Sequence, residues 1–526
     1  MDILRLNIEK DPPPPTETEV RLHVALLAGV AAVAASLAAR FVFGAPLIPE
    51  LLAQFIFAVS PIWVVEIAVG FLGPFAKHLA FLACVVVYLI ALAFAALGHL
   101  RFASAQESAL VRRAGLAAFA LITWASTLLV IIPALGGGLA GRYLRQGALY
   151  TSVSLFFVHL VYGVALAVAS KLYIEKSPGG DRRKAIVGRR RVIRGVGYAV
   201  LAVGAYDIAR SLLQPWWQSG SGRVKGGDGV FPNIDDLALE VTPTADFYEV
   251  SKNAFDPDVD AKRWKLEVSG LVENPLSLTY DEIRSLPSIQ QYATLACISN
   301  EVGGDLIGNA LWRGVRLKDL LERAMLKEGV VDIVLKAGDD YTDSIPLDRA
   351  LNEATALVYE MNGEPLTPAH GFPLRLLVPG IYGMKNVKWI TRVEAVSYDL
   401  KGYWQRRGWN DRAEYKTMSR IDAPGNSVKG GATIAGVAFA GDRGISRVEV
   451  STDGGRTWQD AEIKAPLSPI AWALWQKPWT PAQPGKHRVL VRATDGRGIT
   501  QTAQHAPPDP DGSSGYDSKV ISSEGD

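Results

Sequence analysis

The sequence predicts an N-terminal bundle of membrane-spanning α-helices, followed by an α+β domain and a C-terminal all-β sandwich. Three observations lead to this expectation. Uncharged apolar runs of bilayer-crossing length fill the first ~215 residues. Strand patterns mixed with short helical ones begin near residue 241. After about residue 420, only strand patterns separated by Gly, Asp and Pro turns remain.

Length and composition bound the domain count and exclude some classes. A chain of 526 residues is too long for one compact core. A net charge of +2 gives no sign of nucleic-acid binding, and two cysteines cannot build a disulfide scaffold or a four-thiolate metal site. We expect a membrane domain at 1–214, a flexible linker at 215–240, an α+β domain at 241–416, a sandwich at 417–506 and a loose tail at 507–526.

Six membrane spans are expected in the first domain. The second is the weakest, because Pro61 and Glu66 interrupt it. The opening residues lack the basic region of a cleavable signal peptide. The expected spans are about 22–43, 47–72, 76–98, 114–136, 149–172 and 193–214.

The loop 175–194 sets the expected orientation, because it is rich in Lys and Arg and such loops stay in the cytoplasm. A multi-pass protein of the cytoplasmic membrane is then expected, with the N-terminus and everything after ~215 outside. Arg189-Arg190-Arg191 before an apolar segment is also typical of a twin-arginine export signal, and a simple positive-inside anchor explains it equally well.

Histidines in the membrane half raise the question of haem. Facing histidines hold b-type haem, and His78 and His159 are the candidates. The alternative is that each histidine is hydrogen-bonded within the bundle. The expected depths of the two residues in the membrane match poorly, which favours the alternative.

Local patterns place the elements of the polar half. Residues 264–268 alternate as a strand, and Thr279 with Glu282 has the spacing of a helix capping box. Apolar residues at helical spacing predict a helix at 315–326, and Asn362-Gly363 predicts a tight hairpin. Further strands are expected at 372–378, 387–396, 432–440, 446–451, 471–475 and 488–493, and the last four fit a β-sandwich of about 90 residues.

Cys297 is the first candidate for chemistry. The other cysteine, Cys84, lies in an apolar run, so the two are not expected to pair. A free thiol in the polar half is either an inert packing residue or a soft ligand or nucleophile. Four glycines follow within ~18 residues, which indicates either a close backbone approach to a bound group or a tight loop.

A second cluster of polar residues lies between 370 and 389. His370, Arg375, Lys385 and Lys388 stand around Gly and Pro turns. Such donors can converge into a cradle for a phosphate. The alternative is a strand whose basic ends are solvated.

Together these clusters resemble the sulfite oxidase family of mononuclear molybdenum enzymes. The resemblance covers about 240–415 for a molybdopterin-binding catalytic domain and about 418–505 for an immunoglobulin-like dimerisation domain. It implies a molybdopterin-dependent oxidoreductase of sulfite-oxidase-like fold, anchored to the membrane. The motifs that carry it are His-Gly-Phe-Pro-Leu-Arg-Leu-Leu-Val-Pro-Gly from 370, Val-Lys-Trp from 387, Tyr-Trp-Gln-Arg-Arg from 403 and Ser-Thr-Asp-Gly-Gly-Arg-Thr-Trp from 451.

The resemblance assigns roles residue by residue. Cys297 becomes the thiolate ligand of molybdenum, which suits a soft anionic sulfur. Tyr341 matches the active-site tyrosine of the sulfite-oxidising branch, with a half-buried core tyrosine as the alternative. The residues expected to bind the cofactor are Tyr248, Glu249, Asn300, His370, Arg375, Lys385, Asn386, Val387 and Lys388.

Departures from the family pattern bear on the substrate. Glu249 and Val250 occupy positions where the family has an arginine that binds sulfite, and Glu301 follows Asn300 where a basic residue is expected. Lys252 is a point charge without the planar fork of arginine. We therefore expect oxygen-atom transfer on a small oxyanion or sulfoxide-type substrate outside the cytoplasm.

Three alternatives stay open: a sulfite dehydrogenase proper, a fused haem-containing membrane module that carries electrons, and a cofactor-free extracellular receptor. The expected partners are a small-molecule substrate, membrane lipid, a cytochrome or quinone as redox partner, and a second copy of the chain through the sandwich. No nucleic-acid partner is expected.

Overall fold

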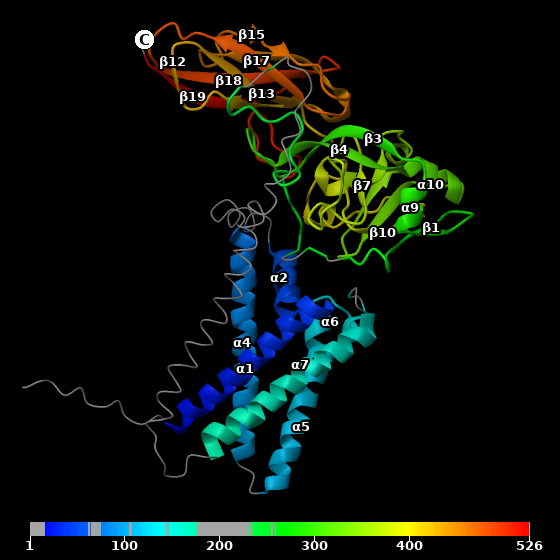
Figure 1. Cartoon of the computed structure of the whole chain (residues 1–526), viewed down its shortest axis with the longest axis vertical. Helices are drawn as coiled ribbons and strands as arrows, with labels where there is room; N and C mark the ends of the chain where they lie inside the picture. Colours follow the sequence, from blue (N-terminus) through cyan, green and yellow to red (C-terminus); the bar gives the residue numbers. More distant parts are fainter. Residues whose placement is uncertain are drawn as a thin grey trace, which may run out of the picture. The chain divides into compact units, whose positions relative to one another are not determined.

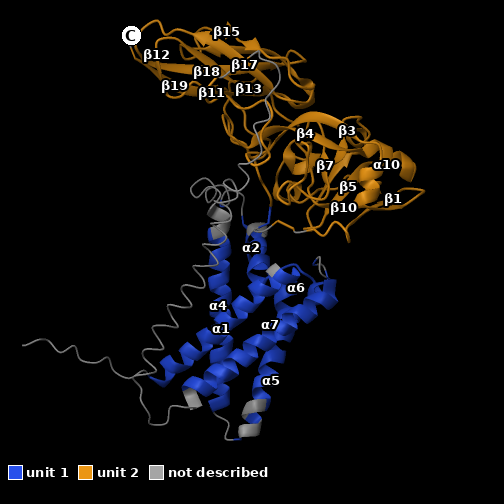
Figure 2. Cartoon of the chain, in the orientation of Figure 1, with its two compact units in different colours: residues 1–213, 252–254 blue, residues 214–251, 255–526 orange. Residues whose placement is uncertain are grey.

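The structure is a computed structural model of the whole chain, and it divides into two compact units (Figure 2). Unit 1 is 1–213 with 252–254, and unit 2 is 214–251 with 255–526. The residues that the structure describes are 16–60, 64, 75–104, 108–142, 144, 147–175, 231, 234–253, 256–257 and 259–524.

The described part of unit 1 is helical (Figure 1). A capping box of Thr16 and Glu19 starts its first helix, which packs against α4 and α7. Pro133 follows a short π-helical stretch in the middle of the bundle. The helices are α1 (Glu17–Phe43), α2 (Ile48–Val59), α4 (Phe75–Ser104), α5 (Ala109–Ser126), η1 (Thr127–Ile131), α6 (Ile132–Ala134), η2 (Leu139–Gly141), α7 (Gly147–Ser170) and η3 (Lys171–Glu175).

Among the described residues, four helical stretches are long and apolar enough to cross a membrane: Glu17–Arg40, Leu79–Ser104, Ala114–Ala134 and Gly147–Tyr173. They correspond to the first, third, fourth and fifth expected spans. The second expected span contains the 12-residue helix α2, and most of its remainder lies outside the described residues. The sixth span, the basic loop from residue 176 and the first 15 residues also lie outside them.

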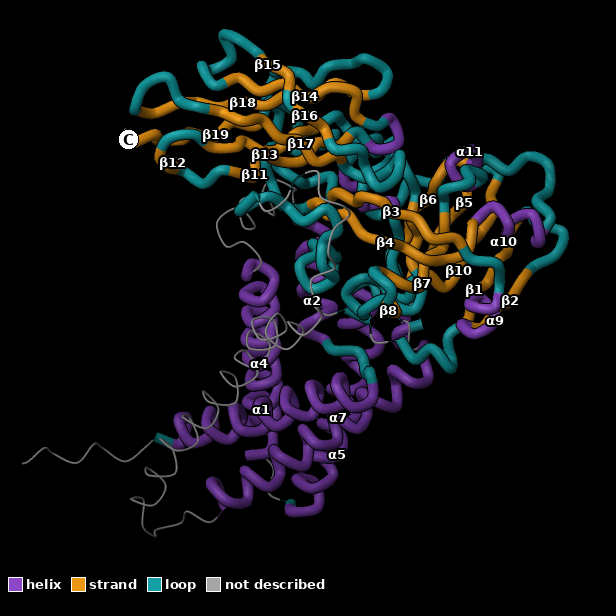
Figure 3. Tube along the Cα trace, turned by 45° about the horizontal axis from the view of Figure 1, so that its top comes forward, coloured by secondary structure: helices purple, strands orange, loops and turns teal. Residues whose placement is uncertain are grey.

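All the described strands lie in unit 2 (Figure 3), and its first part is a mixed α+β domain, as expected. Its helices are α9 (Tyr280–Ser285), α10 (Leu317–Ala324), α11 (Leu347–Ala350), and the 3₁₀ turns η4 (Gly383–Lys385) and η5 (Gln405–Arg407). Its strands are β1 (Lys265–Gly270), β2 (Leu276–Thr279), β3 (Ile289–Ala296), β4 (Ile307–Arg316), β5 (Asp332–Ala337), β6 (Thr342–Pro346), β7 (Ala356–Met361), β8 (Glu364–Pro365), β9 (Arg375–Leu377) and β10 (Ile390–Val396).

Two sheets organise this domain. The first has the order β2-β1-β10-β5-β6, and the second has the order β3-β4-β7-β8 with β9 paired to β7. The capping box at Thr279 and Glu282 starts α9, as predicted. The predicted hairpin joins β7 to β8, because Asn362 and Gly363 both have positive φ angles, 53° and 85°. Strand β9 is shorter than the predicted strand 372–378.

The second part of unit 2 is an all-β sandwich, as expected, with sheets β11-β13-β17-β16 and β12-β19-β18-β14-β15. Trp475, Val489, Val491 and Ile521 lie in its core with no solvent exposure. Its strands are β11 (Met418–Ala423), β12 (Ser427–Lys429), β13 (Ala432–Phe439), β14 (Ile445–Ser451), β15 (Gln459–Asp460), β16 (Glu462–Ile463), β17 (Ala473–Trp479), β18 (Gly485–Asp495) and β19 (Asp517–Glu524).

The prediction of a loose tail at 507–526 is wrong. Strand β19 lies between β12 and β18, and it pairs with β18 from Gly485 to Val491. The many Gly, Ser and Asp residues of the tail hid the alternation that ends in Ile521 and Ser523, which are both buried. The sandwich therefore extends to residue 524.

The prediction of a flexible linker at 215–240 is wrong for its last residues. Glu240 is buried and forms an ion pair with Lys464 of the sandwich. The backbone N–H of Ala238 donates to Asp422 Oδ2 at 3.1 Å. Short-range composition does not show such long-range partners, which are more than 180 residues away.

A pair of adjacent residues tests whether the last strand belongs to the core. Ile521→Ala removes a fully buried side chain, so we expect it to destabilise the sandwich by about 2–5 kcal/mol. Val520 lies on the opposite face and is 53% exposed, so Val520→Ala is the matched control with a small effect. Thermal or denaturant unfolding measures both. Equal effects of the two substitutions would contradict the observed register.

Candidate active site around Cys297

Cys297 follows the last residue of β3, at the entrance to a tight loop. Its backbone N–H donates to Leu306 O at 2.9 Å, and its carbonyl accepts the N–H of Asn300 at 3.1 Å. The side chain is 8% exposed, and its Sγ lies 2.9 Å from Ser299 Oγ. Strand β3 is paired along its whole length with β4, so the thiol stands on a rigid element.

Three tyrosines surround this thiol: Tyr248, Tyr382 and Tyr415. Tyr415 Oη accepts the N–H of Ala296 at 3.0 Å, one residue before the cysteine. The rings of Tyr382 and Tyr415 are 4.6 Å apart, in an edge-to-face arrangement. Tyr248 Oη is 2.7 Å from the position that a Cβ on Gly383 would take, so only glycine fits there.

Burial keeps these phenols protonated. It raises the pKa of Tyr382 to about 12 and the pKa values of Tyr248 and Tyr415 well above the usual value, and a charge on Cys297 raises all three further. Tyr415 Oη and Tyr382 Oη accept the backbone N–H groups of Ala296 and Lys416. Protonated phenols can donate hydrogen bonds, so these groups suit a bound molecule that offers acceptor atoms.

Arg375, at the start of β9, places an uncompensated positive charge beside the tyrosines. Its side chain is buried, and it donates to His370 O at 3.2 Å and to Asn386 O at 3.5 Å. Its guanidinium lies 5.2 Å from the centre of the Trp312 ring, and its Nε has no partner. Among the described residues, no carboxylate lies within 4.0 Å of it.

Burial lowers the pKa of Arg375 to about 10, yet the group remains cationic at neutral pH. A buried cation with no counter-ion carries a large desolvation cost. The arrangement therefore favours an anion at this position, with the free Nε as a donor.

His370 supports Arg375 and does not add charge. Burial lowers the pKa of His370 to about 4, so the imidazole is neutral at pH 7. Its Nε2 lies 2.9 Å from Thr244 O and its ring packs edge-on against Phe247. Its backbone carbonyl receives the bond from Arg375.

Lys385, which was expected to belong to the anion cradle, contacts acceptors of the protein itself. Its ammonium is buried and donates to Asp343 Oδ1 at 3.1 Å, to Ser344 O at 2.9 Å and to Asp411 Oδ1 at 3.5 Å. These acceptors use all three of its protons. Lys388 Nζ instead donates to Ala369 O at 2.8 Å, and its charge also acts on the exposed Glu249.

Asn300, Asn386 and Val387 shape the loops of the site. Asn386 uses its whole amide, accepting from Val378 N and donating to the carbonyls of Ile381 and Tyr382. Asn300 Oδ1 accepts the N–H of Leu306 at 2.9 Å, which closes the loop after Cys297. Val387 is buried in the core, and its carbonyl accepts the N–H of Leu376 at 2.8 Å.

Tyr341 directly precedes β6 and reaches the same loop. Its Oη lies 2.8 Å from Met384 O and 3.1 Å from Asp343 Oδ2. Met384 follows Gly383, against which Tyr248 packs, so one turn connects Tyr341 to the tyrosines around Cys297. Burial raises the pKa of Tyr341 well above its usual value, and the charge of Asp343 adds to this effect.

Sequence reasoning missed Tyr382, Tyr415 and Asp343. Tyr415 lies 119 residues from its partner Ala296, so no local pattern reveals the contact. Asp343, on β6, follows Tyr341 by two residues, and this spacing in extended chain places both side chains on one face. That alternation was a usable signal for the pair.

The haem candidates are only partly described. His159 is buried, and its ring nitrogens lie 3.1 Å from Thr127 Oγ1 and 2.8 Å from Leu155 O. Both nitrogens are thus engaged within the bundle in this arrangement. The side chain of His78 lies outside the described residues.

Comparison with known proteins gives matches over unit 2. The family model described as the oxidoreductase molybdopterin binding domain matches residues 253–404, and the model described as the Mo-co oxidoreductase dimerisation domain matches residues 415–506.

Among curated proteins, the mitochondrial sulfite oxidase of Rattus norvegicus is 34% identical over 290 residues, which covers 45% of this chain and 53% of the relative. The uncharacterized oxidoreductase YuiH of Bacillus subtilis is 36% identical, with 30% of this chain and 76% of the relative covered. Sulfite oxidase of Arabidopsis thaliana is 32% identical, with 42% of this chain and 70% of the relative covered.

The chain thus spans about half the length of the mammalian sulfite oxidases that it matches. A solved structure, the sulfane dehydrogenase SoxCD from Paracoccus pantotrophus, aligns with a TM-score of 0.49 at 24% identity, over 55% of this chain and 84% of that chain. The family models, and relatives above 30% identity that are covered over more than two thirds of their length, agree with one another. The chain belongs to the sulfite oxidase family of molybdopterin-binding proteins.

Proposed function

We propose that this chain is a membrane-anchored molybdenum–molybdopterin oxidoreductase that transfers an oxygen atom to or from a small substrate. The observation that carries the proposal is that Tyr248 and Tyr415 each lie near both the Cys297 thiol and the buried guanidinium of Arg375, which has no carboxylate partner among the described residues. Around the thiol stand three phenols that burial keeps protonated. A soft ligand, a cation and neutral donors are what an anionic metal–pterin cofactor requires.

The residues present fit this cofactor. Cys297 would supply the thiolate to molybdenum, and Arg375 with Lys388 would balance the anionic part of the pterin. Tyr248, Tyr382 and Tyr415 would donate hydrogen bonds and exclude water from the thiolate. When bound, the cofactor supplies two-electron chemistry at the metal, and the protein supplies orientation and field. Tyr341 would hold a proton near the reacting oxygen.

The charges near the site favour a weakly charged substrate. Val250 is 39% exposed, and Glu249 and Glu301 are exposed, where the family pattern has basic residues. These carboxylates repel a dianion such as sulfite. We therefore place a sulfoxide-type substrate first and a small oxyanion second, with a sulfite dehydrogenase as the alternative function.

The apolar helices of unit 1 support a location in the cytoplasmic membrane. The Lys- and Arg-rich sequence at 175–194 favours a catalytic part outside the cytoplasm. Electrons would then pass to or from a membrane quinone or a cytochrome, and a haem in the bundle remains a second candidate. The match to a dimerisation domain supports a homodimer through the sandwich. We propose 241–416 as the molybdopterin-binding domain and 417–524 as the sandwich.

Metal analysis and two assays test the function. The full-length chain, purified in detergent from a molybdenum-replete host, should carry about one molybdenum per chain, since Cys297 alone of its two cysteines lies in the polar half. With an artificial electron carrier, sulfoxide reduction should exceed sulfite oxidation in kcat/KM. Efficient sulfite turnover would refute the substrate argument, and a metal-free, inactive protein would favour a receptor instead. An absorbance band of haem that disappears in His159→Ala would establish the fused electron-transfer module.

A further inference from the structure

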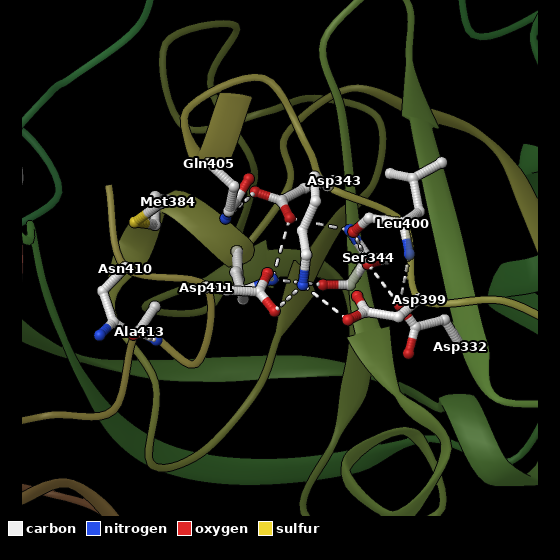
Figure 4. Close-up of polar contacts among 12 residues, drawn as sticks. Asp332, Asp343, Ser344, Met384, Asp399, Leu400, Gln405, Asn410, Asp411 and Ala413 are labelled. Carbon is white, nitrogen blue, oxygen red and sulfur yellow. Dashed lines mark hydrogen bonds and ion pairs between the residues drawn. The ribbon is translucent and has the colours of Figure 1, made fainter. Parts of the chain in front are cut away.

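A buried polar network lies behind Tyr341, and the chemistry described so far does not use it. Asp343, on β6, is fully buried and accepts hydrogen bonds from four groups. Figure 4 shows Asp343, Ser344, Gln405 and Asp411 gathered in one network. The donors to Asp343 are Tyr341 Oη at 3.1 Å, Gln405 Nε2 at 3.2 Å, Ser344 N at 2.8 Å and Lys385 Nζ at 3.1 Å.

Tyr341 has one proton and two acceptors. Its Oη is 2.8 Å from Met384 O and 3.1 Å from Asp343 Oδ2, and a phenol donates only once. With Asp343 ionised, Tyr341 donates to only one of these two oxygens, and the other contact has no proton between its two oxygen atoms. With Asp343 protonated, the carboxyl donates to Tyr341 and Tyr341 donates to Met384 O, so both contacts are satisfied. The geometry thus has a place for one additional proton.

The pKa values of the two carboxyl groups, Asp343 and Asp411, shift in opposite directions. Burial raises the pKa of Asp343, although the Lys385 ammonium opposes the rise. Partial burial acts the same way on Asp411, but its hydrogen bond with Lys401 prevails and lowers the pKa. When their environments shift the pKa values of two carboxyl groups in opposite directions, one group typically holds a proton and the other stays ionised.

The network leads from Tyr341 to solvent. Lys385 Nζ contacts both Asp343 and Asp411, and Asp411 Oδ2 accepts from Lys401 Nζ at 2.6 Å. The side chains of Asp411 and Lys401 are 38% and 48% exposed, whereas those of Lys385 and Asp343 are 3% and 0% exposed. A continuous series of polar contacts therefore joins the buried phenol to the surface.

The proposed reaction needs such a proton store. Reduction of a sulfoxide consumes two protons and two electrons and gives a sulfide and water. Oxidation of a substrate by oxygen transfer from water releases the same two protons and two electrons. The electrons pass to or from the external redox partner, and the protons must pass through groups beside the reacting oxygen.

We propose that Asp343 is the positioning residue of Tyr341 and stores the proton that Tyr341 exchanges with the reacting oxygen, while Lys385 and Gln405 hold it in place. In the reductive direction, Tyr341 gives its O–H proton to the substrate oxygen and takes the carboxyl proton of Asp343. In the oxidative direction, both transfers reverse. This inference rests on the proposed function, and it names Asp343 as acting through Tyr341.

A structural ion pair between Asp343 and Lys385 is the competing interpretation. It predicts that Asp343→Asn lowers stability without changing how activity depends on pH. A proton store predicts a changed pH profile. The other charged and titratable groups around Asp343 and Tyr341 are Asp332, Asp339, Lys385, Asp399, Lys401, Tyr403, Arg407 and Asp411.

Kinetics on the full-length holoenzyme provide the first test. We expect Asp343→Asn and Tyr341→Phe each to lower kcat by about 100-fold with KM unchanged, and the double variant to lose no more than either one. In the reductive direction, the wild-type kcat should fall as pH rises through the pKa of Asp343, and Asp343→Asn should lack this decline. Asp399→Asn is the matched control, since Asp399 contacts Lys401 and lies outside the series from Tyr341 to Asp411. Additive losses, or an unchanged pH profile, would overturn the proposal.

Infrared titration of the cofactor-free chain provides a test that does not depend on turnover. The C=O stretch of a protonated carboxyl should titrate above the usual range of aspartate and disappear in Asp343→Asn. Tyr341→Phe should move this titration upward, because the carboxylate loses a donor, and this variant serves if Asp343→Asn does not fold. Absence of the band in an active enzyme would refute the proton store alone. If the band is present but the chain purified from a molybdenum-replete host holds no molybdenum, the proposed function alone would be refuted.

Discussion

Cys297→Ser is expected to leave the purified chain without molybdenum and to abolish turnover. The substitution exchanges a soft thiolate for a hard hydroxyl that stays protonated at neutral pH. Removing a partner of a metal ligand already costs about 10–100-fold. Loss of the ligand itself should therefore cost at least about 100-fold in kcat. Elemental analysis and the sulfoxide assay measure the two effects.

The other cysteine provides the matched control. Cys84 is also buried, but it lies in α4 of the apolar bundle. Cys84→Ser should therefore keep both metal and activity. The fold should survive Cys297→Ser, because the backbone bonds of the loop to Leu306 and Asn300 do not involve the sulfur. Full metal content in Cys297→Ser would show that the thiol is not the ligand.

The sequence contained the periodic elements and the motif residues of the site. The capping box at Thr279 and Glu282 and the hairpin at Asn362 follow from patterns a few residues long. These are local interactions, and local propensities decide them. The resemblance to a family added the role of Arg375. Only the structure shows that this arginine has no carboxylate partner among the described residues.

What the sequence could not show depends on long-range contacts. Lys385 and Lys388 are three residues apart, yet one is saturated by Asp343 and Asp411 while the other contacts Ala369. A count of basic residues treats them alike. The wrong assignment of the tail has the same origin, because β19 forms only when its partner strands on both sides are in place. The ion pairs of a lysine and the pairing of a strand form only in the folded chain, so the sequence alone does not show them.

Arg375→Met is expected to separate stability from function. The lowering of the pKa of this arginine from 12.5 to about 10 corresponds to roughly 3 kcal/mol of destabilisation of the cofactor-free chain at neutral pH. The sign follows from linkage: the folded state holds this proton less tightly, so the cost is fully present below pH 10 and is relieved as pH rises toward 12.5. Methionine fills similar space without the charge.

Opposing contributions limit the gain. The arginine donates two hydrogen bonds, at 3.2 and 3.5 Å, and the longer is at the limit of a real bond. Its contact with Trp312 contributes about 1–2 kcal/mol. We therefore expect cofactor-free Arg375→Met to unfold at the same temperature as wild type or at a higher one. The variant should retain little cofactor, because no other buried cation replaces the guanidinium beside Tyr248 among the described residues.

Arg349→Met is the matched control with the opposite expectation. Arg349 pairs with Asp442 at 2.7 Å and with Glu414, so its removal leaves carboxylates without their cation. This variant should lose stability and keep its cofactor. Differential scanning calorimetry of the cofactor-free chains, together with pterin and molybdenum content of the holoproteins, gives both quantities for each variant. A destabilised Arg375→Met that still binds the cofactor would contradict this account. It would mean that Arg375 stabilises the fold and that the anion binds elsewhere in the protein.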